Sequence, residues 1–275
     1  MRKTYAVAKK KLKEFNDPSR GFYLNLLLTS NEGTIVGNMW DGGVEAESNI
    51  QEGDVIEVDA DKTSFRGSPQ LNINGFDLLD SDQYEPEEFI AEGDYTKQEL
   101  VEMFDYYIDN HFSDKLFNQI HNIIKPYFDQ FFKWPAAQYY HHAYIGGLAV
   151  HSLEVFNLVS AMLERIHVLN IGVDTDLALV GALIHDVGKV HAYNLKGSIV
   201  TTTKGDELGH LALGLECIEH LPESDFKRGL RHIIASHHGK QEWGAITEPQ
   251  TIEAHLVHQA DAASSQITKE VEHGA

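Results

Sequence analysis

Hydrophobic and polar residues alternate in short runs through the first third of the chain. The alternation predicts strands at residues 21–31, 34–40, 54–65 and 68–79. Between these runs lie turn-forming stretches such as DPSRG, NEGT, WDGG and RGSP, in which glycine, proline, Asn and Asp supply turn conformations. Short strands punctuated in this way predict a small β-barrel, for which the OB-fold is the natural candidate.

After about residue 96 the period of the apolar positions becomes helical. Apolar residues recur at three- and four-residue steps, which predicts helices with no strand between them. The predicted helices are 97–112, 115–132, 151–169, 175–188, 207–221, 225–238 and 251–268. We therefore predict a multidomain β + α protein with an OB-fold domain at 1–82, an acidic linker at 83–95 and an all-α domain at 96–275.

Composition narrows the class of protein. Hydrophobic residues make up 42% of the 275 positions, enough for a substantial core. No apolar run reaches the roughly 18 residues that cross a bilayer, and the basic start MRKTYAVAKKKLKEF lacks the apolar core of an export signal. The single cysteine, Cys217, excludes an internal disulfide and a thiolate metal site. These features together predict a cytoplasmic protein.

The charge balance limits the nucleic acids that the chain could bind. Twenty-two Lys and Arg stand against 42 Asp and Glu, for a net charge of −20. Strong affinity for duplex phosphates comes from Lys and Arg, so a protein that coats duplex DNA is not expected. A local groove could still bind single strands, whose bases stack on aromatic rings. The candidate rings on the predicted barrel are Phe22, Tyr23, Trp40 and Phe65, with packing in the barrel core or rim as the alternative for each.

His185 and Asp186 follow the apolar stretch TDLALVGALI. Taken alone, this pair predicts a buried, hydrogen-bonded structural contact. Further residues of the same two types lie beside predicted buried faces of other helices: His151, His210, His237, His238 and Asp261. Burying such side chains is costly unless they are paired. A shared pair of divalent metal ions would satisfy all of them.

The residue types also indicate a chemistry. Histidine nitrogens and carboxylate oxygens suit Mn, Fe, Co or Zn, and Asp186, in the middle of the series, is the candidate bridge between two ions. Two ions about 3.5–4 Å apart lower the pKa of a bridging water and clamp a phosphoryl group. The pattern therefore predicts phosphoester hydrolysis.

The order H…HD…H…HH…D resembles the HD phosphohydrolase superfamily in its two-metal variant. This resemblance implies two ligand sets that share Asp186. One set would be His151, His185, Asp186 and Asp261, and the other Asp186, His210, His237 and His238. Residues 135–152, 181–193, 203–214 and 233–261 more narrowly resemble the YhaM-type 3′-to-5′ exoribonucleases, which join an amino-terminal OB-fold to an HD domain.

The narrower resemblance implies a metal-dependent 3′–5′ exoribonuclease. Its substrate would be single-stranded RNA or single-stranded DNA, cleaved by a metal-activated water to nucleoside 5′-monophosphates. Two Mn²⁺ ions are the expected cofactors, with Fe²⁺, Co²⁺ or Mg²⁺ as alternatives, and a homo-oligomer is the expected assembly.

Three further residues are candidates near this site. Lys189 could stabilise charge on a substrate phosphate or be a surface lysine at a helix end. His142 could bind the phosphate or protonate a leaving group, or it could cap or pack. Glu253 could orient a metal-binding histidine from outside the ligand set.

Two other classes of function stay open on the sequence. An HD phosphodiesterase for a small cyclic or signalling nucleotide would use the same metal site, with the barrel as an assembly or regulatory element. A nucleic-acid-binding module with a structural metal is disfavoured, because structural sites are usually closed by four ligands. Seven ligands over two ions would leave positions open for water and phosphate.

Overall fold

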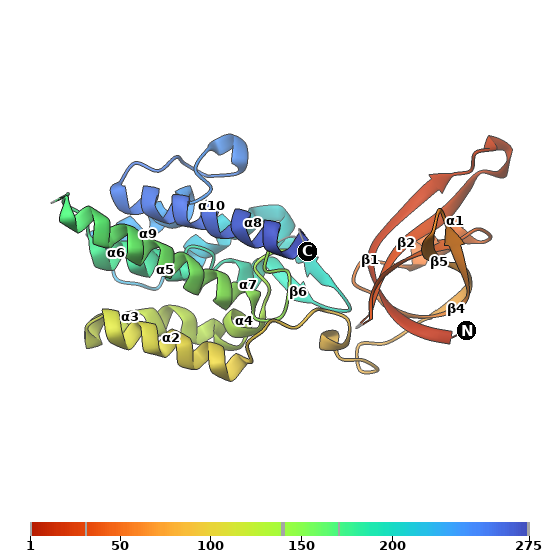
Figure 1. Cartoon of the computed structure of the whole chain (residues 1–275), viewed down its shortest axis with the longest axis horizontal. Coiled ribbons are helices and arrows are strands. Elements are labelled where there is room, and N and C mark those ends of the chain that lie inside the picture. The colour runs from red at the N-terminus through yellow and green to blue at the C-terminus, as the bar shows by residue number, and fades with distance from the viewer. Residues whose placement is uncertain (1, 31, 139–140, 170, 274–275) are drawn as a thin grey trace. The chain divides into compact units, whose positions relative to one another are not determined.

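The chain forms two compact units in the computed structural model, which describes residues 2–30, 32–138, 141–169 and 171–273. The first unit contains Met1–Glu92 and Leu195–Val200, and the second contains Gly93–Asn194 and Thr201–Ala275. Figure 1 shows a β-barrel in the first unit and a set of helices in the second. This confirms the predicted order of a small barrel followed by a helical domain.

The barrel of the first unit is closed, with strand order β1-β2-β3-β5-β4. Its strands are β1 (Arg2–Glu14), β2 (Phe22–Ser30), β3 (Gly33–Met39), β4 (Val55–Phe65) and β5 (Ser68–Leu78), with helix α1 (Gly43–Asn49) between β3 and β4 in sequence. The β3–β5 pair is parallel and aligns Val36 with Gln70, whereas the other strand pairs are antiparallel. This is the OB-like arrangement that the sequence predicts.

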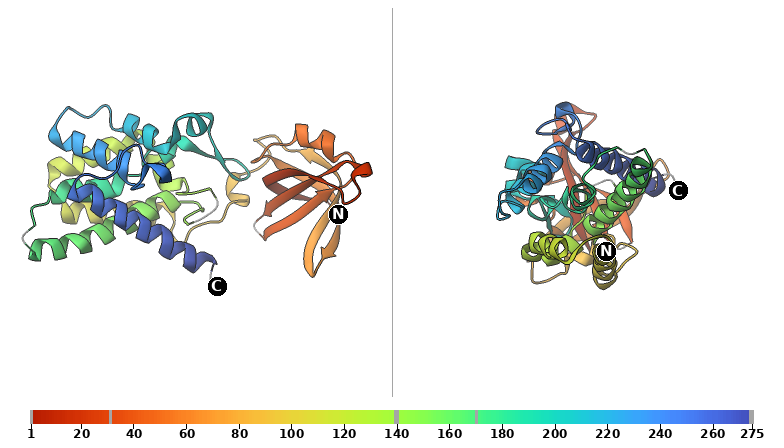
Figure 2. Two further views of the ribbon diagram at one scale, coloured as in Figure 1. Left: turned by 90° about the horizontal axis from the view of Figure 1, so that it is seen from above. Right: turned by 90° about the vertical axis from the view of Figure 1, so that its left-hand side faces the viewer.

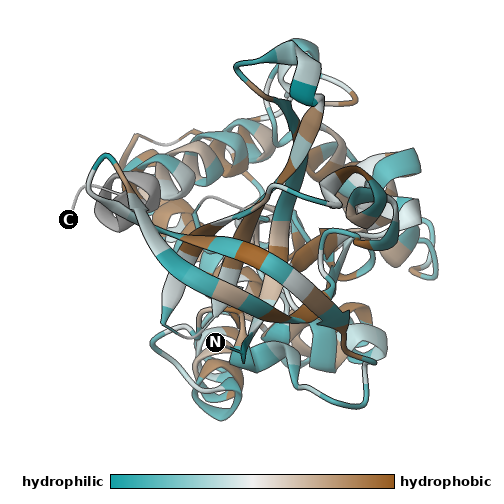
Figure 3. Ribbon diagram, turned by 90° about the vertical axis from the view of Figure 1, so that its right-hand side faces the viewer, coloured by the Kyte–Doolittle hydropathy of each residue, from teal (hydrophilic) through white to brown (hydrophobic). Residues whose placement is uncertain are grey.

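Alternate residues of the strands fill the barrel. Leu24, Leu26 and Leu28 on β2 are buried, and Figure 3 shows the strands banded in alternating hydrophobic and hydrophilic colours. Strand β1 lies outside the predicted strand ranges. Its lysines are typical of an exposed segment. Its four consecutive buried residues, Tyr5–Ala8, interrupt the period-two alternation, because the register of the strand shifts between Val7 and Lys9.

The segment predicted as a linker is partly packed. A short 3-10 turn, η2 (Pro86–Glu88), precedes Phe89, which packs with Ala6 and Val55 in an apolar cluster of the first unit. The segment Leu195–Val200 also belongs to this unit. Within it, the amide of Gly197 donates to the carbonyl of Gly53.

The second unit consists mainly of helices. They are α2 (Lys97–His111), α3 (Asp114–Ile124), α4 (Phe128–Lys133), α5 (Gly147–Val168), α6 (Thr175–Ile184), α7 (Lys189–Ala192), α8 (Thr203–Cys217), α9 (Asp225–Ser236) and α10 (Ile252–His273), with 3-10 turns η3 (Lys125–Tyr127) and η4 (Gln241–Trp243). The helix predicted at 115–132 is divided, because Pro126 cannot donate a backbone hydrogen bond in a helix interior. None of the helices in the described ranges combines the length and apolarity that crossing a bilayer requires.

The prediction that no strand interrupts the helices is wrong. Strands β6 (Tyr193–Leu195) and β7 (Ile199–Thr201) form a two-stranded sheet between α7 and α8 in sequence. Each strand has three residues, too few for a period-two pattern to stand out from its surroundings.

The core of the helical unit sits where α5, α6 and α10 pack together. Figures 1 and 2 show α5 and α10 running side by side. Large buried side chains such as Phe104, Phe131 and Phe156 fill the space between the helices. The polar residues predicted as metal ligands project from α5, α8 and α10 and from the ends of α6 and α9.

Candidate metal centre

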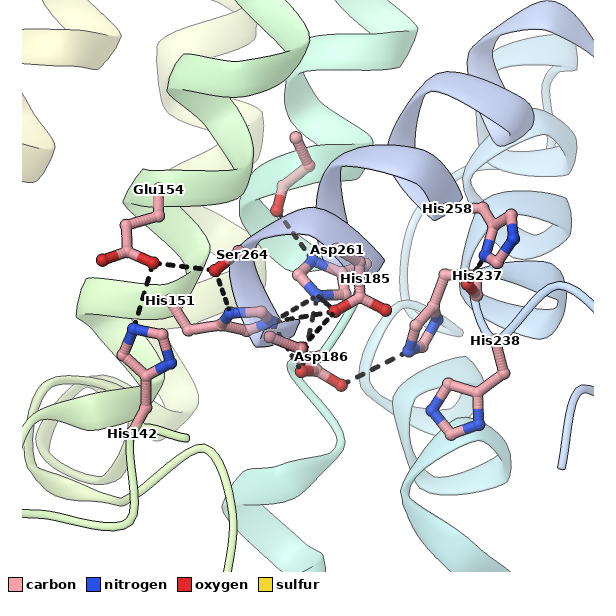
Figure 4. A network of polar contacts seen from close by, with 12 residues as sticks. His142, His151, Glu154, His185, Asp186, His237, His238, His258, Asp261 and Ser264 are labelled. Carbon is pink, nitrogen blue, oxygen red and sulfur yellow. Dashed lines mark hydrogen bonds and ion pairs between the residues drawn. The ribbon is translucent and has the colours of Figure 1, made fainter. Parts of the chain in front are cut away.

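The seven predicted ligands lie together in the helical unit, and Figure 4 labels all of them except His210. We call this set the His/Asp cluster: His151, His185, Asp186, His210, His237, His238 and Asp261. His151 is in the first turns of α5, the 185–186 pair directly follows α6, the 237–238 pair directly follows α9, and Asp261 is within α10. Helix ends and one buried helix face thus converge on one small volume.

Two glycines permit this convergence. Gly209 has φ +71° and interrupts α8 immediately before His210, so the helix changes direction where the ligand emerges. Gly147 starts α5, and a Cβ there would lie 2.1 Å from the carbonyl oxygen of His142. The chain around His142, which itself has φ +56°, can approach α5 only because that side chain is missing.

Asp186 lies at the centre of the cluster and faces two sets of histidines. Its Oδ2 is 3.5 Å from His151 Nε2 and 3.4 Å from His185 Nε2. Its Oδ1 is 3.4 Å from both His210 Nε2 and His237 Nε2. One carboxylate oxygen therefore serves each half of the cluster, as a bridge between two ions would require.

Asp261 and His238 extend the two halves. Asp261 Oδ1 lies 3.1 Å from His151 Nε2 and 3.9 Å from His185 Nε2. His238 Nε2 lies 3.1 Å from His210 Nε2. These distances agree with the two sets implied by the family resemblance, and His185, His237 and Asp261 also form a group across the two sets.

Outer hydrogen bonds orient three of the rings. Nδ1 of His185 donates to the carbonyl of Ala182 at 2.8 Å, and Nδ1 of His237 donates to the carbonyl of Ile234 at 2.9 Å, because a carbonyl can only accept. In each ring the Nε2 lone pair then points into the cluster. Metal-binding histidines commonly show this arrangement.

The third ring, His151, is oriented by two consecutive side-chain hydrogen bonds, which run through Ser264 to Glu154 (Figure 4). Ser264 Oγ has one proton and donates it to Glu154 Oε2 at 2.7 Å, so it accepts from His151 Nδ1 at 3.0 Å. Glu154 Oε2 also lies 3.1 Å from Nε2 of His142, which is fully buried. His142 is thus held beside the cluster by the same carboxylate that orients a candidate ligand.

Burial lowers the pKa of His185, His210 and His238, whereas His151 is an exception. Burial lowers the pKa of His238 to about 4 and holds the pKa of His210 well below its ordinary value, so both rings are neutral near pH 7. Burial also opposes the charge on His151, but hydrogen bonds with Asp186 and Asp261 outweigh it and raise the pKa of His151 to about 9. A metal bound in that half would displace a proton.

The cluster fits divalent metal ions. Asp186 Oδ1 and His237 Nε2 are buried and have no hydrogen-bond partner among the described residues. Buried polar atoms in native proteins normally find a partner, and these two atoms face into the cluster. Imidazole and carboxylate are also the donor types that first-row divalent metals accept. The cluster could therefore hold divalent ions, which would satisfy the unpaired atoms.

Lys189 and Glu253 lie in different surroundings. Lys189 is buried and forms an ion pair with Asp186, and this pairing outweighs burial to raise the pKa of the Lys189 ammonium. Glu253 Oε1 accepts from the backbone amide of Asp174 at the start of α6, and no contact with a ring of the cluster is among its described hydrogen bonds. The orienting position assigned to Glu253 from the sequence is occupied by Ser264 and Glu154.

The aromatic candidates of the barrel lie on its outer side. Tyr23 and Trp40 have ring centroids 4.5 Å apart, and Phe15 joins them at 5.1 Å from Tyr23. We call these three the outer aromatic cluster. Phe22 and Phe65 are 50% and 59% exposed, so neither packs in the barrel core.

Residues that the sequence reasoning missed stand next to both sites. The guanidinium of Arg20 lies 4.0 Å from the centroid of the Phe15 ring, and Trp40 Nε1 donates to Asn72 Oδ1 at 3.0 Å. At the His/Asp cluster, Ser264 and Glu154 were missed. Their helical spacing carries a signal, because Ser264 is three residues after Asp261 and Glu154 three after His151, on the same helix faces.

The chain is similar to known proteins over most of its length. The HD domain family matches residues 148–265. The 3′-5′ exoribonuclease YhaM of Oceanobacillus iheyensis is 30% identical over 251 residues, covering 89% of this chain and 78% of that protein. The chain belongs to the YhaM family. This membership confirms the family resemblance seen in the sequence.

Other YhaM proteins match over a similar length. The 3′-5′ exoribonuclease YhaM of Listeria monocytogenes serotype 4b is 27% identical over 89% of this chain and 79% of that protein. The crystal structure of the L. monocytogenes phosphodiesterase PgpH HD domain covers 56% of this chain and 74% of that one, with 18% identity and a TM-score of 0.33. A score this low does not establish a shared fold.

Proposed function

We propose that the protein is a metal-dependent 3′–5′ exoribonuclease that releases nucleoside 5′-monophosphates from single-stranded RNA. The observation that carries the proposal is the central carboxylate of Asp186, which presents one oxygen to each of two sets of histidines. Membership of the YhaM family supports the RNA substrate and the direction. Single-stranded DNA as a second substrate, and a homo-oligomeric assembly, stay predictions.

The residues present would hold two ions. His151, His185, Asp186 and Asp261 would bind one, and Asp186, His210, His237 and His238 the other. When bound, such ions activate water and neutralise the charge of the phosphoryl group. Mn²⁺ is our expected metal, and the mixed His and carboxylate donor set also accepts Fe²⁺ or Co²⁺.

The protein's own groups would prepare the site. The outer hydrogen bonds of His151, His185 and His237 fix their Nε2 atoms toward the cluster before substrate arrives. The Lys189 ammonium beside Asp186 would contact a non-bridging phosphate oxygen and stabilise the charge that develops there. His142, next to His151, would donate a hydrogen bond to the phosphate or a proton to the leaving oxygen.

Product mapping tests this function. The purified protein, with its metal content measured, is incubated with Mn²⁺ and single-stranded RNA labelled at either the 5′ or the 3′ end. We expect the 3′ label to appear at once as a labelled mononucleotide and the 5′ label to shorten stepwise. Cleavage of a cyclic dinucleotide while the RNA stays intact would replace this function with a small-nucleotide phosphodiesterase.

A further inference from the structure

The loop between α9 and α10 carries an exposed aromatic ring beside the His/Asp cluster. Trp243, at the end of the 3-10 turn η4, is 58% exposed. Tryptophan is usually highly buried, because its large ring gains much from leaving water. An indole that stays in water on a loop invites the question of what covers it.

The loop that carries Trp243 is fixed by its own backbone. The amides of Gly244 and Ala245 donate to the carbonyls of Gln241 and Lys240, and the amide of Ile246 donates to the carbonyl of Ala235 on α9 at 2.9 Å. The last of these bonds ties the loop to α9, the helix that His237 directly follows. The ring is therefore presented from a preformed support, which reduces the entropy lost when a ligand binds.

The loop also touches the candidate ligands. A Cβ at Gly244 would lie 3.3 Å from Nδ1 of His238. The Trp243 ring centroid lies 6.4 Å from that of His258, whose Nδ1 donates to the carbonyl of His237 at 2.7 Å. Trp243 thus directly precedes Gly244, which lies close to His238. Its ring lies beside His258, which is hydrogen-bonded to the backbone of His237.

A positive charge accompanies the ring. Lys240 Nζ lies 4.9 Å from the Trp243 centroid. The same ammonium lies 3.4 Å from Glu242 Oε1, in an exposed ion pair that water weakens, so a phosphate can take the place of Glu242. Aromatic rings bind nucleobases by stacking, and neighbouring cations bind the phosphates between them. An apolar protein partner would gain nothing from the ammonium.

We propose that Trp243 is a stacking platform for a base that flanks the scissile phosphate, with Lys240 binding an adjacent phosphate. This inference rests on the proposed exoribonuclease function and adds to it a substrate contact at the metal centre itself. The stacking contact tolerates any base, as degradation of RNA of mixed sequence requires. It also places the last nucleotides against the half of the cluster that contains His237 and His238.

The test compares Trp243→Ala with the wild-type protein on two RNAs, one intact and one lacking its last two 3′ bases. On intact RNA we expect the KM of Trp243→Ala to rise about tenfold, with kcat changed much less and with metal content unchanged. On the abasic RNA the two proteins should have the same KM, because there is no base to stack. Trp243→Phe should recover most of the loss, and in EDTA the same pattern should appear in the Kd for RNA.

Ile246→Ala is the matched control, because Ile246 is exposed and lies in the same loop. It should behave as wild type on both RNAs. Equal KM values for Trp243→Ala and wild type on intact RNA would overturn the inference and leave the proposed function standing. A change in oligomeric state together with an equal defect on both RNAs would make Trp243 a subunit contact instead. A wild-type protein that leaves RNA intact would overturn both proposals.

Discussion

In the barrel, the apolar side chains Leu24, Leu26 and Leu28 fill the interior and the candidate binding rings stand outside. In the helical unit the order is reversed, since His185 and Asp186 are each 1% exposed within the packed helices. The barrel carries its candidate binding rings on its surface, whereas the helical unit carries its candidate metal ligands inside its core. They should therefore respond differently when that chemistry is removed.

The difference follows from the cost of burying polar groups. An exposed ring such as Phe65 keeps its water contacts, and its removal affects mainly what binds to it. A buried carboxylate such as Asp186 depends on its partners, and removal of one member leaves the others unpaired at a cost of several kcal/mol. The barrel surface can change one residue at a time, whereas the His/Asp cluster behaves as a unit.

The largest effect is expected from Asp186→Asn, which keeps the shape of the side chain and removes the charge shared by both halves of the cluster. Loss of an outer partner alone costs about 10–100-fold in metal affinity. Loss of the shared ligand should therefore cost more than about 100-fold in metal affinity, with RNA hydrolysis lost in parallel. Metal analysis and a hydrolysis assay measure this. Asp225→Asn, on an exposed part of α9, is the control, and full hydrolysis by Asp186→Asn would remove the cluster from catalysis.

A smaller loss is expected from Ser264→Ala, which cuts the chain from Glu154 to His151 without touching a ligand. The His151 ring would lose the acceptor for its Nδ1 proton, so metal affinity should fall about 10–100-fold. Titration with Mn²⁺ measures the affinity. Ser113→Ala provides the comparison, because the Ser113 side chain makes no capping hydrogen bond to α3. Unchanged affinity in Ser264→Ala would show that packing alone orients His151.

A loss of binding without loss of metal is expected from Trp40→Ala in the outer aromatic cluster. Removing one stacking ring should weaken binding of single-stranded RNA by about 1–3 kcal/mol, with the metal content of the helical unit intact. Fluorescence anisotropy with labelled RNA measures this. Tyr106→Ala, which removes a ring that is 64% exposed on α2, should bind RNA as wild type does. Equal affinities for the Trp40 and Tyr106 variants would assign the outer aromatic cluster to barrel packing.

The smallest effect is expected when the native protein is treated with a thiol reagent, because its cysteine, Cys217, is buried in the helical core. Burial raises the pKa of its thiol to about 11, so the reactive thiolate is scarce at pH 8 and increases only as the pH rises toward that value. A thiol reagent should label the native protein far more slowly than the unfolded protein at pH 8. Labelling at the unfolded rate would place Cys217 on a segment that opens readily.

The sequence predicted the His/Asp cluster well because metal binding constrains residue type. The His185-Asp186 pair taken alone indicates only a structural contact, whereas the order of all seven residues indicates the HD superfamily. The sequence predicted Glu253 as an outer partner, and Glu253 accepts from the Asp174 amide in the structure. It missed Ser264 and Glu154, because a serine or glutamate on a helix is common and only its spacing from a ligand distinguishes these two. That spacing becomes meaningful once the inward face of α10 is known.

The barrel was predicted as a class and less well in detail. Strand β1 was missed because its register shift and its lysines hide the period-two pattern, although its pairing with both β2 and β4 closes the barrel. Strands β6 and β7 were missed because their pairing depends on the turn between them and not on a repeated pattern. Closure and pairing are properties of contacts between distant segments, which a local period does not contain.

The hydroxyl of Ser264 has a consequence for how the metal centre can be adjusted. Ser264 donates its only hydroxyl hydrogen bond to Glu154 and accepts one from His151. The His151 imidazole is therefore connected through Ser264 to a carboxylate whose side chain is 43% exposed. The partly exposed carboxylate of Glu154 thus influences the electron density on the ring nitrogens of His151, which is fully buried. Substitutions at the surface position 154 can thus tune the basicity of the buried ring while every ligand stays unchanged.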